Sequence, residues 1–373
     1  MATVEYKVEY GATYATLSNV ATNVQSVNLT VGRQRQLDQY NANTATVVMR
    51  YPTGYASPNA LFITGTWVRI SVRLVEAGSA WGQLFVGKIA DVNTEYGIPY
   101  AGGVGNADYV TLNCEGNFAA FGRAQGGGYS MAADILGVQC SNAYIQSGLP
   151  VQALSLYGYS QPFPATTINS TWGDWVNRCV LTMNGRLIDS GDSVVISNAY
   201  YKIAGTFGGF SDTTNDASNH SYNQIAFTSY ADNWYTQVTV TPESYGPATV
   251  QTGLVPYRTY QVNTLNNSTS QATDYANYLL SNYGTRTTRI LSVTCLLNDQ
   301  SGDIPRYGAD YIGAQVSVLF RGTTYQCVIE GATWSGTPSQ ASATFYLSAQ
   351  DLNNYLTLND AIYGKLDNNK LGY

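Results

Sequence analysis

Alternating apolar and polar residues run through the first 120 residues and predict short β-strands. In VEYKVEY, residues 4–10, Val and Tyr occupy every second position, and Glu and Lys lie between them. The same alternation returns three times, at Val27-Leu29-Val31, at Val68-Ile70-Val72-Leu74 and at Val110-Leu112-Cys114. Turn-forming residues separate the runs, as at 52–54 (PTG) and 102–103 (GG). Short half-buried strands separated by turns are typical of an antiparallel barrel or sandwich.

The pattern changes after residue 121. Residues 131–144 carry a weak helical pattern through Met131, Ile135, Leu136 and Val138. Residues 172–186 form a mixed apolar segment that leads through Asn184-Gly185 into an expected hairpin, because Asn-Gly is a favoured hairpin turn. We therefore expect small α/β insertions in the middle of a mainly β chain.

The clearest helix is expected at residues 270–283, SQATDYANYLLSNY. Ser270 suits the N-cap, and Gly284 suits the position after the last turn. Helical spacing puts four apolar or aromatic residues on one face, which we expect to be buried: Ala272, Tyr275, Leu279 and Tyr283.

The two ends of the chain show an internal repeat. The order VRISVRL, LFVGKI and YVTLNCE near the N-terminus returns as AQVSVLF, YQCVIEGATW and ASATFYLSAQD near the C-terminus. The repeat predicts two related β-barrel-like domains, and the alternative is a chance likeness between Thr- and Val-rich strands. The predicted division is an N-terminal barrel at 1–120, a middle α+β domain at 121–205, a second insertion at 206–288 and a C-terminal barrel at 289–373.

Composition favours a surface that is covered by other protein. Charged residues make up only 11% of the chain, while 31 Tyr and 36 Gly accompany many Thr, Asn, Ser and Gln residues. Such a surface interacts through hydroxyl and amide groups; an extracellular lectin-like β protein is the alternative. The net charge of −6, without any block of Lys or Arg, argues against tight binding of nucleic acid through its phosphates.

Neither export nor oxidised cysteine chemistry is expected. The opening MATVEYKVEY has acidic residues where a signal peptide has its apolar run, and no stretch approaches the length of a membrane span. The five cysteines are odd in number, and no two lie closer than 26 residues. This spacing argues against metal or disulfide sites and predicts buried free thiols, at Cys114, Cys140, Cys179, Cys295 and Cys327.

Catalytic motifs are lacking in the sequence. The single histidine, His220, lies in a polar Asn/Ser/Asp run where a solvated side chain is expected. Carboxylate pairs that a glycosidase would need occur at Asp189 with Asp192 and at Asp91 with Glu95, yet any 24 acidic residues produce such pairs. The Asp/Asn run at 212–219 lacks the spacing and the terminal Glu of a calcium loop. We predict no catalytic residues, no metal site and no cofactor.

Several of the few charged residues lie close together in residues 31–54, VGRQRQLDQYNANTATVVMRYPTG. Arg33, Arg35, Asp38 and Arg50 flank a Tyr-Asn-Ala-Asn loop and a strand-like TATVV. Arginine forks suit bidentate contacts to carbonyl and carboxylate oxygens. We expect Arg33 or Arg35 to pair with Asp38 or with an acidic residue of a neighbouring subunit, thereby fixing how the barrel docks. The alternative is an intramolecular clasp over the barrel mouth.

The same segment resembles the N-terminal part of minor tail proteins of long-tailed bacteriophages. The matching element comprises Gly32, Arg33, Leu37, Asp38, Tyr40, Ala42, Thr44 and Ala45, followed by Leu84, Phe85 and Gly87. The C-terminal VIEGATWSGTPSQASATFYLS and LNDAIYGKLDNNKLGY look like the closing barrel and terminal sequence of that family. One departure is Asn43, which stands where the family has Gly.

The resemblance implies a structural virion protein at the tip of a phage tail, a tail hub of the baseplate. Its two β-barrels, joined through insertions, would form a homotrimeric ring with six similar positions around the tail axis. The implied partners are further copies of the chain, the distal tail or tube protein, the tape-measure protein, and fibre or tip proteins. DNA would pass through without specific binding. The protein would be made in the host cytoplasm and would not be an enzyme.

Two other functions compete with this interpretation. A carbohydrate-binding receptor module would expose an aromatic row around Trp172, Trp175 and Trp234. A tail-associated glycan hydrolase would lose its activity when one acid pair is replaced.

Overall fold

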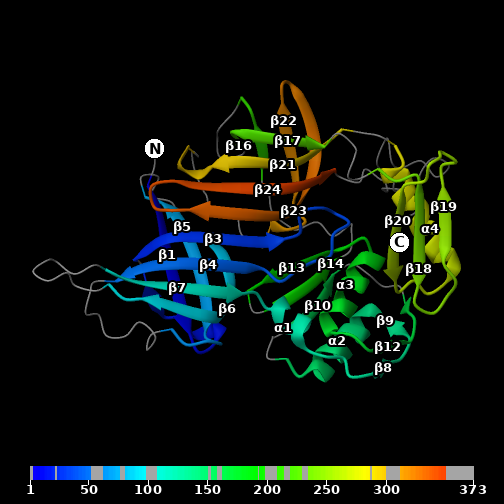
Figure 1. The fold of residues 1–373 in the computed structure, drawn as a ribbon, viewed down its shortest axis with the longest axis horizontal. Helices are drawn as coiled ribbons and strands as arrows, with labels where there is room; N and C mark the ends of the chain where they lie inside the picture. Colours follow the sequence, from blue (N-terminus) through cyan, green and yellow to red (C-terminus); the bar gives the residue numbers. More distant parts are fainter. Residues whose placement is uncertain are drawn as a thin grey trace, which may run out of the picture.

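The computed structural model describes most of the chain, and Figure 1 shows its arrangement. The described residues are 3–21, 23–51, 62–75, 80–97, 107–149, 153–157, 162–191, 193–197, 208–213, 219–228, 234–285, 288–299 and 311–349. The turns expected at 52–54 and 102–103, Asp192 of the first carboxylate pair, and the C-terminal LNDAIYGKLDNNKLGY lie outside them.

The chain is mainly β, as predicted, and its largest unit is a sheet of 14 strands. The sheet runs in the order β16-β15-β22-β23-β3-β4-β7-β6-β5-β1-β2, and β24 and β21 continue from β23 to β17. Its strands are β1 (Val4–Gly11), β2 (Asn19–Ala21), β3 (Val24–Gly32), β4 (Thr44–Tyr51), β5 (Trp67–Leu74), β6 (Gly82–Glu95), β7 (Asp108–Glu115), β15 (Gly209–Ser211), β16 (Asn219–Ser221), β17 (Gln224–Thr228), β21 (Arg289–Leu296), β22 (Gln315–Phe320), β23 (Thr323–Gly336) and β24 (Ala341–Ala349). Two short 3-10 helices, η1 (Tyr14–Thr16) and η3 (Leu297–Asp299), adjoin them.

The internal repeat is present in the topology of this sheet. The N-terminal strands follow the order β1-β5-β6-β7-β4-β3, and the C-terminal strands follow β15-β22-β23-β24-β21-β17. β6 and β23 are each 14 residues long, and each changes register near its middle, between Ile89 and Asp91 and between Ile329 and Gly331. One difference is that β15 runs parallel to β22, whereas β1 is antiparallel to β5.

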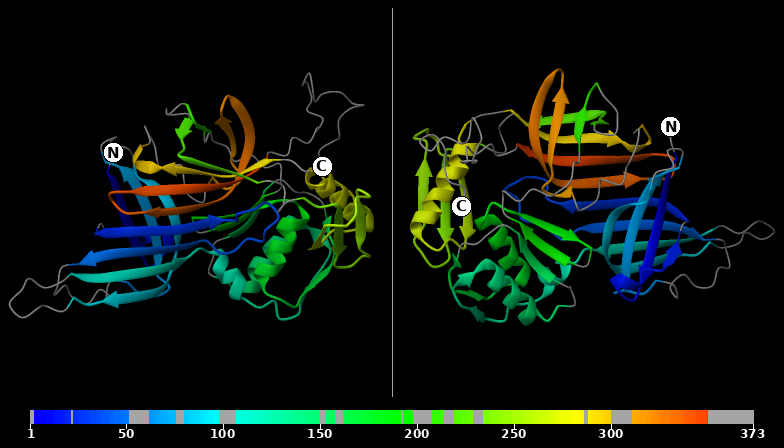
Figure 2. Two further views of the ribbon diagram at one scale, coloured as in Figure 1. Left: turned by 45° about the horizontal axis from the view of Figure 1, so that its top comes forward. Right: turned by 180° about the vertical axis from the view of Figure 1, so that it is seen from behind.

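The two repeats are joined edge to edge. β23 pairs antiparallel with β3 from Gly331–Gly32 to Gly336–Val27, so the two ends of the chain share one continuous sheet (Figures 1 and 2). The predicted barrels are not confirmed as closed, because the hydrogen-bonded order of the described strands ends at β16, β17 and β2. The apolar positions predicted from alternation, such as Val27, Val68 and Leu112, are buried, except Tyr10, which is half-buried.

The middle of the chain forms smaller units beside the large sheet. The first contains the sheet β10-β14-β13, two short β-ribbons and three helices. Its elements are α1 (Phe118–Arg123), β8 (Tyr129–Met131), β9 (Asp134–Ile135), α2 (Leu136–Ser147), β10 (Ala153–Tyr157), β11 (Pro162–Phe163), β12 (Thr166–Ile168), α3 (Trp172–Thr182), β13 (Arg186–Ser190) and β14 (Ser193–Ser197). Thr171 caps α3 in a capping box with Asp174, and the helix buries Trp175 and Val176.

Two local expectations in this part are corrected. The helical pattern at 131–144 is shared between two short strands and α2, which begins at Leu136. The Asn184-Gly185 pair connects α3 to β13, with Asn184 in a left-handed conformation (φ 49°), and it does not form a hairpin turn. The β13–β14 hairpin turns instead at Gly191, whose φ is +60°.

The second small unit consists of a three-stranded sheet and one helix. Its elements are β18 (Gln237–Pro242), β19 (Ala248–Gln251), β20 (Thr259–Thr264) and α4 (Thr269–Tyr283). The expected buried face of α4 is confirmed, from Ala272 to Tyr283. Its cap is corrected: Ser268, and not Ser270, accepts the Gln271 N–H at 3.1 Å. Strands β15, β16 and β17, which the predicted division puts with this insertion, pair within the large sheet.

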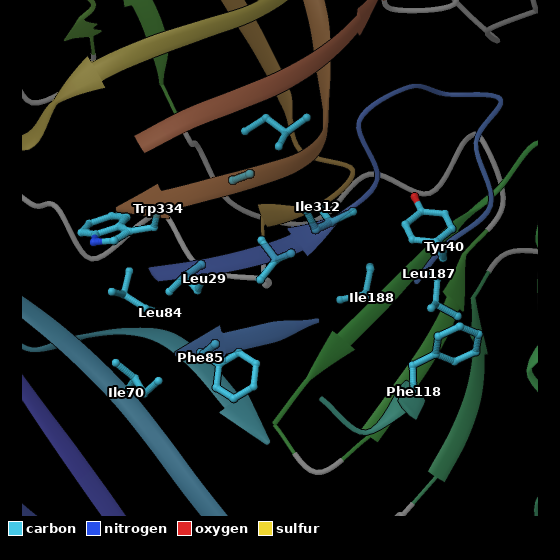
Figure 3. Close-up of a cluster of buried hydrophobic side chains, with 14 of the residues drawn as sticks. Leu29, Tyr40, Ile70, Leu84, Phe85, Phe118, Leu187, Ile188, Ile312 and Trp334 are labelled. Atoms are coloured by element: carbon cyan, nitrogen blue, oxygen red, sulfur yellow. The ribbon is translucent and has the colours of Figure 1, made fainter. Parts of the chain in front are cut away.

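One hydrophobic core runs from the large sheet into the first small unit. Figure 3 shows Leu29 and Trp334 of the large sheet, and Ile312 just before β22, in the same cluster as Leu187 and Ile188 of β13. All five predicted free thiols are buried and unpaired with each other, as expected. The large sheet and the first small unit share this core. The chain segment where the two meet provides the contacts that hold them together.

Candidate functional site

The junction is built around the connection between β3 and β4, residues 33–43, hereafter the β3–β4 connection. β3 ends at Gly32, whose φ is +71° and whose α-carbon approaches the Glu330 carbonyl so closely that a β-carbon would lie 2.4 Å from it. Glycine is therefore required at this position. The next residue, Arg33, donates its main-chain N–H to the same carbonyl at 3.0 Å.

Arg33 is buried and is held by four groups. Its Nε donates to the Glu330 carboxylate at 2.9 Å, and its two terminal nitrogens donate to the carbonyls of Gly185 at 3.2 Å and Asp38 at 3.4 Å. The guanidinium also lies 4.6 Å from the ring centre of Tyr40. One side chain thus ties β23, the start of β13 and the β3–β4 connection together.

Glu330 is the acid at the centre of a buried charge cluster. A second arginine, Arg186 of β13, donates to its other oxygen at 3.0 Å, and the Ser348 hydroxyl donates to that oxygen at 2.7 Å. Burial alone would raise the pKa of the Glu330 carboxyl, but Arg186 and Arg33 lower it from 4.5 to about 2. The carboxylate is therefore ionised at every ordinary pH.

The β3–β4 connection also contacts both small units through amide groups. Tyr40 and Asn177 of α3 exchange two hydrogen bonds, the Tyr40 N–H donating at 2.9 Å and its carbonyl accepting at 3.1 Å. Gln36 accepts from the Tyr283 hydroxyl of α4 and donates to Asn184 at 3.5 Å. The Asn177 amide satisfies the main chain of Tyr40, and the Gln36 side chain links the connection to both small units.

Asn43, where the resemblance leads us to expect Gly, closes the other end of the connection. Its amide accepts from the Gly32 N–H at 3.0 Å and donates to the Asp189 carbonyl at 3.1 Å. The Asp189 carboxylate in turn accepts from the main chain of Asn117 and Phe118, both at 3.0 Å, and from the Asn117 amide. Asp189 thereby fixes β13 to the start of α1, the helix that follows β7.

Asp189 predicts a pH dependence of stability. Burial raises the pKa of its carboxyl from 3.8 to about 6, although the three N–H donors lower it. Because the folded state binds this proton more tightly than the unfolded state, the contribution is present below pH 3.8 and is lost as the pH rises through about 6. Relative to Asp189→Asn, the wild-type free energy of unfolding should fall by roughly 2 kcal/mol from about pH 4 to pH 6.5. Urea titrations of both proteins across this pH range measure the difference in unfolding free energy. A difference that stays constant or rises with pH contradicts the prediction.

The four residues predicted at this site have different surroundings. Arg33 pairs with Glu330 and meets Asp38 at the main-chain carbonyl, so the expected Arg33–Asp38 ion pair is replaced by an intramolecular clasp. Arg35, Asp38 and Arg50 have exposed side chains. The sequence analysis missed Glu330, although a lone acidic residue within the apolar run CVIEGAT was a signal for a buried, paired charge.

Residues considered for other chemistry are accounted for as follows. The prediction of a solvated His220 is wrong, because this side chain is buried in β16 beside Phe210. Trp172 and Trp175 are buried in the core, so they do not form an exposed aromatic row. Asp91 and Glu95 lie exposed on β6.

A pocket of about 300 Å³ lies at the bulge of β6. Its lining includes Thr64, Lys88, Ile89, Ala90 and Glu115. Among the described residues, no helix is long and apolar enough to span a membrane.

The fold is that of bacteriophage tail proteins, which confirms the resemblance at the level of the fold. No family model matches the sequence, and no curated protein matches it either. The structure is similar to the 43 kDa tail protein of prophage MuSo2 from Shewanella oneidensis, with a TM-score of 0.62 and 13% identity over 93% of this chain and 98% of that one.

Two further solved structures share the fold. A tail protein from Neisseria meningitidis MC58 gives a TM-score of 0.64 and 10% identity over 94% of this chain and 97% of that chain. The E. coli c3393 protein gives a TM-score of 0.52 and 8% identity over 92% of this chain and 77% of that chain. It is a component of the type VI secretion system that exhibits structural similarity to the T4 tail proteins gp27 and gp5.

Proposed function

We propose that this protein is a structural component of a phage tail tip, a hub that links the tail tube to tip or fibre proteins. The observation that carries the proposal is the likeness of its fold, over nearly the whole chain, to tail proteins of similar length. The proposal includes a virion location and no enzymatic activity. In keeping with a structural role, the buried charges of the junction are engaged with one another and with the main chain.

The proposed assembly is a ring of three copies around the tail axis. Two repeats per chain, joined in one continuous sheet, would provide six similar positions in such a trimer. The exposed residues Arg35, Asp38 and Arg50 are proposed to lie at subunit boundaries. Arg33 would act indirectly, by holding the β3–β4 connection that carries two of them. The acidic balance of the chain suits a conduit that does not retain DNA.

The test is the position and symmetry of the chain in a particle. Cryo-electron microscopy of tails that carry this chain is expected to show it as a threefold ring at the distal end of the tube, in contact with tube and tip proteins. Mass spectrometry of purified particles should detect it at a few copies per particle. A chain that is absent from particles and remains a monomer in the lysate would refute the proposal.

A further inference from the structure

The two repeats correspond residue by residue around the bulges of β6 and β23. The Gly65 N–H donates to the Ile89 carbonyl at 2.7 Å, and the Gly313 N–H donates to the Ile329 carbonyl at 2.7 Å. Both glycines have left-handed backbones, with φ of +87° and +89°. The bulge in each long strand follows the matched isoleucine. Ile89 therefore corresponds to Ile329, and the residues after each bulge can be matched in order.

In the C-terminal repeat, the strand segment after the bulge has neighbours on both edges. Residues 331–336 of β23 pair with β24 on one side and with residues 27–32 of β3 on the other. Within this joint Asn28 lies opposite Ser335, whose hydroxyl donates to the Asn28 side-chain oxygen at 2.7 Å. The joint between the repeats is a strand-to-strand interface of known register.

In the N-terminal repeat, the matching segment has one neighbouring strand among those that the structure describes. Residues 91–95 of β6 pair with β7, and no other described strand pairs with them. Asp91, Asn93 and Glu95 are exposed along this segment. By the match at the bulges, Glu95 corresponds to Ser335 and Asn93 to Thr333.

β17 is the counterpart of β3, and it too is paired on one edge only in the part of the chain that the structure describes. In one repeat Asn28 pairs with Thr46, which pairs with Asn113 of β7. In the other, Ala226 pairs with Ser292, which pairs with Tyr346 of β24. β3 pairs with β4 and β23, whereas β17 pairs with β21 alone among the described strands.

The pocket at the β6 bulge supports the match independently. Its lining residues Thr64, Ile89, Ala90 and Glu115 correspond to Ile312, Ile329, Glu330 and Ser348. In the C-terminal repeat that location is filled by Gly32, the last paired residue of β3, and by Arg33, which follows it. In the N-terminal repeat the described chain provides no such cover, and a pocket of about 300 Å³ opens there.

We infer that β17 of one copy pairs antiparallel with residues 91–95 of β6 in the next copy, reproducing between subunits the β3–β23 joint within the chain. The register places Ala226 opposite Glu95, as Asn28 lies opposite Ser335 within the chain. The two edges differ, so the contact is head-to-tail, as a ring requires. This inference rests on the proposed ring assembly, and it identifies the surfaces that form it.

The experiment uses single-cysteine variants of the full chain, Ala226→Cys and Glu95→Cys. Directly opposed residues of antiparallel strands have α-carbons about 4.5–5.5 Å apart, within disulfide range. After mild oxidation of an equimolar mixture, we expect a disulfide-linked dimer on a non-reducing gel, and no dimer with either variant alone. The native thiols do not compete, because all five are buried.

Two controls test register and reactivity. Asp91→Cys in place of Glu95→Cys moves the thiol four residues along the strand, about 13 Å, and should abolish the cross-link. Asn28→Cys with Ser335→Cys in one chain should close the corresponding disulfide within the chain, without a change of mass.

The mass of each unoxidised sample, measured by light scattering, separates the two proposals. A ring in which Ala226→Cys and Glu95→Cys do not cross-link, or in which Ala226→Cys links to itself, overturns the edge pairing and leaves ring assembly standing. A chain that is a monomer at every concentration and in the particle overturns both.

Discussion

Replacing Glu330 with glutamine is expected to lower the free energy of unfolding by roughly 3–5 kcal/mol, the usual cost of breaking a buried ion pair. Two guanidiniums depend on this carboxylate, and the side chains of Arg33 and Arg186 are only 2% and 5% exposed. Glutamine keeps the shape of the side chain, yet it leaves both cations without a counter-charge in a region where water does not reach them. Urea unfolding at neutral pH, with the free energy extrapolated to water, measures the loss.

A matched control separates charge from hydrogen bonding at the same carboxylate. Ser348→Ala removes one hydrogen bond to Glu330 and leaves both ion pairs intact, so it should cost about 1 kcal/mol. If Glu330→Gln costs no more than Ser348→Ala, the buried cluster does not hold the two repeats and the first small unit together.

The Glu330→Gln variant also tests how the stability contributed by Glu330 depends on pH. The pKa of Glu330 is lowered from 4.5 to about 2, so its contribution to stability is complete above pH 4.5 and is lost as the pH falls towards 2. The difference in unfolding free energy between wild type and Glu330→Gln should therefore shrink by roughly 3 kcal/mol over that interval. A difference that stays constant down to the acid limit would contradict this account.

Replacing Arg33 with alanine is expected to cost roughly 2–5 kcal/mol, the range for truncating one partner of a buried, hydrogen-bonded charge pair. The variant loses the bonds to Glu330, Asp38 and Gly185 together with the contact to the Tyr40 ring. Glu330 still has Arg186 as a counter-charge in this variant. The lower limit of the expected loss of unfolding free energy is therefore smaller than for Glu330→Gln.

Arg35→Ala is the control for this variant. Arg35 lies two residues away in the same connection and carries the same charge, but its side chain is exposed, so its removal should change stability by no more than about 0.5 kcal/mol. Amide hydrogen exchange gives a second measurement: Arg33→Ala should speed exchange in residues 33–43 and at the start of β13. Equal effects of the two substitutions would show that charge in the segment, and not the clasp, is what matters.

The sequence analysis located the right segment and assigned it an incomplete set of partners. Charge patterning singled out Arg33 as one of few arginines in a polar chain, and the clasp was one of its two predicted roles. Its actual partner, Glu330, lies 297 residues away in sequence. Local reasoning favoured Asp38 because it was near in the chain, whereas the pairing of β3 with β23 brings Glu330 nearer in space.

Elements with a strong period were predicted most accurately. Alternation identified the buried positions of β1, β3, β5 and β7, and helical spacing identified the buried face of α4. The wrong predictions occur where one short stretch of sequence suits two local structures equally well. Ser268 and Ser270 are both good caps, and Asn184-Gly185 suits a hairpin turn as well as the left-handed step from α3 to β13.

By itself the sequence determined the strand-rich class, the repeat at the two ends and the buried thiols, because these depend on side-chain periodicity and composition, which are properties of each segment alone. Only the tertiary structure decided that the two repeats share one sheet through β3 and β23, and that Glu330 joins Arg33 to Arg186. Strand edges carry the same main-chain donors and acceptors whatever their side chains are, so which edges meet is settled by the fold as a whole.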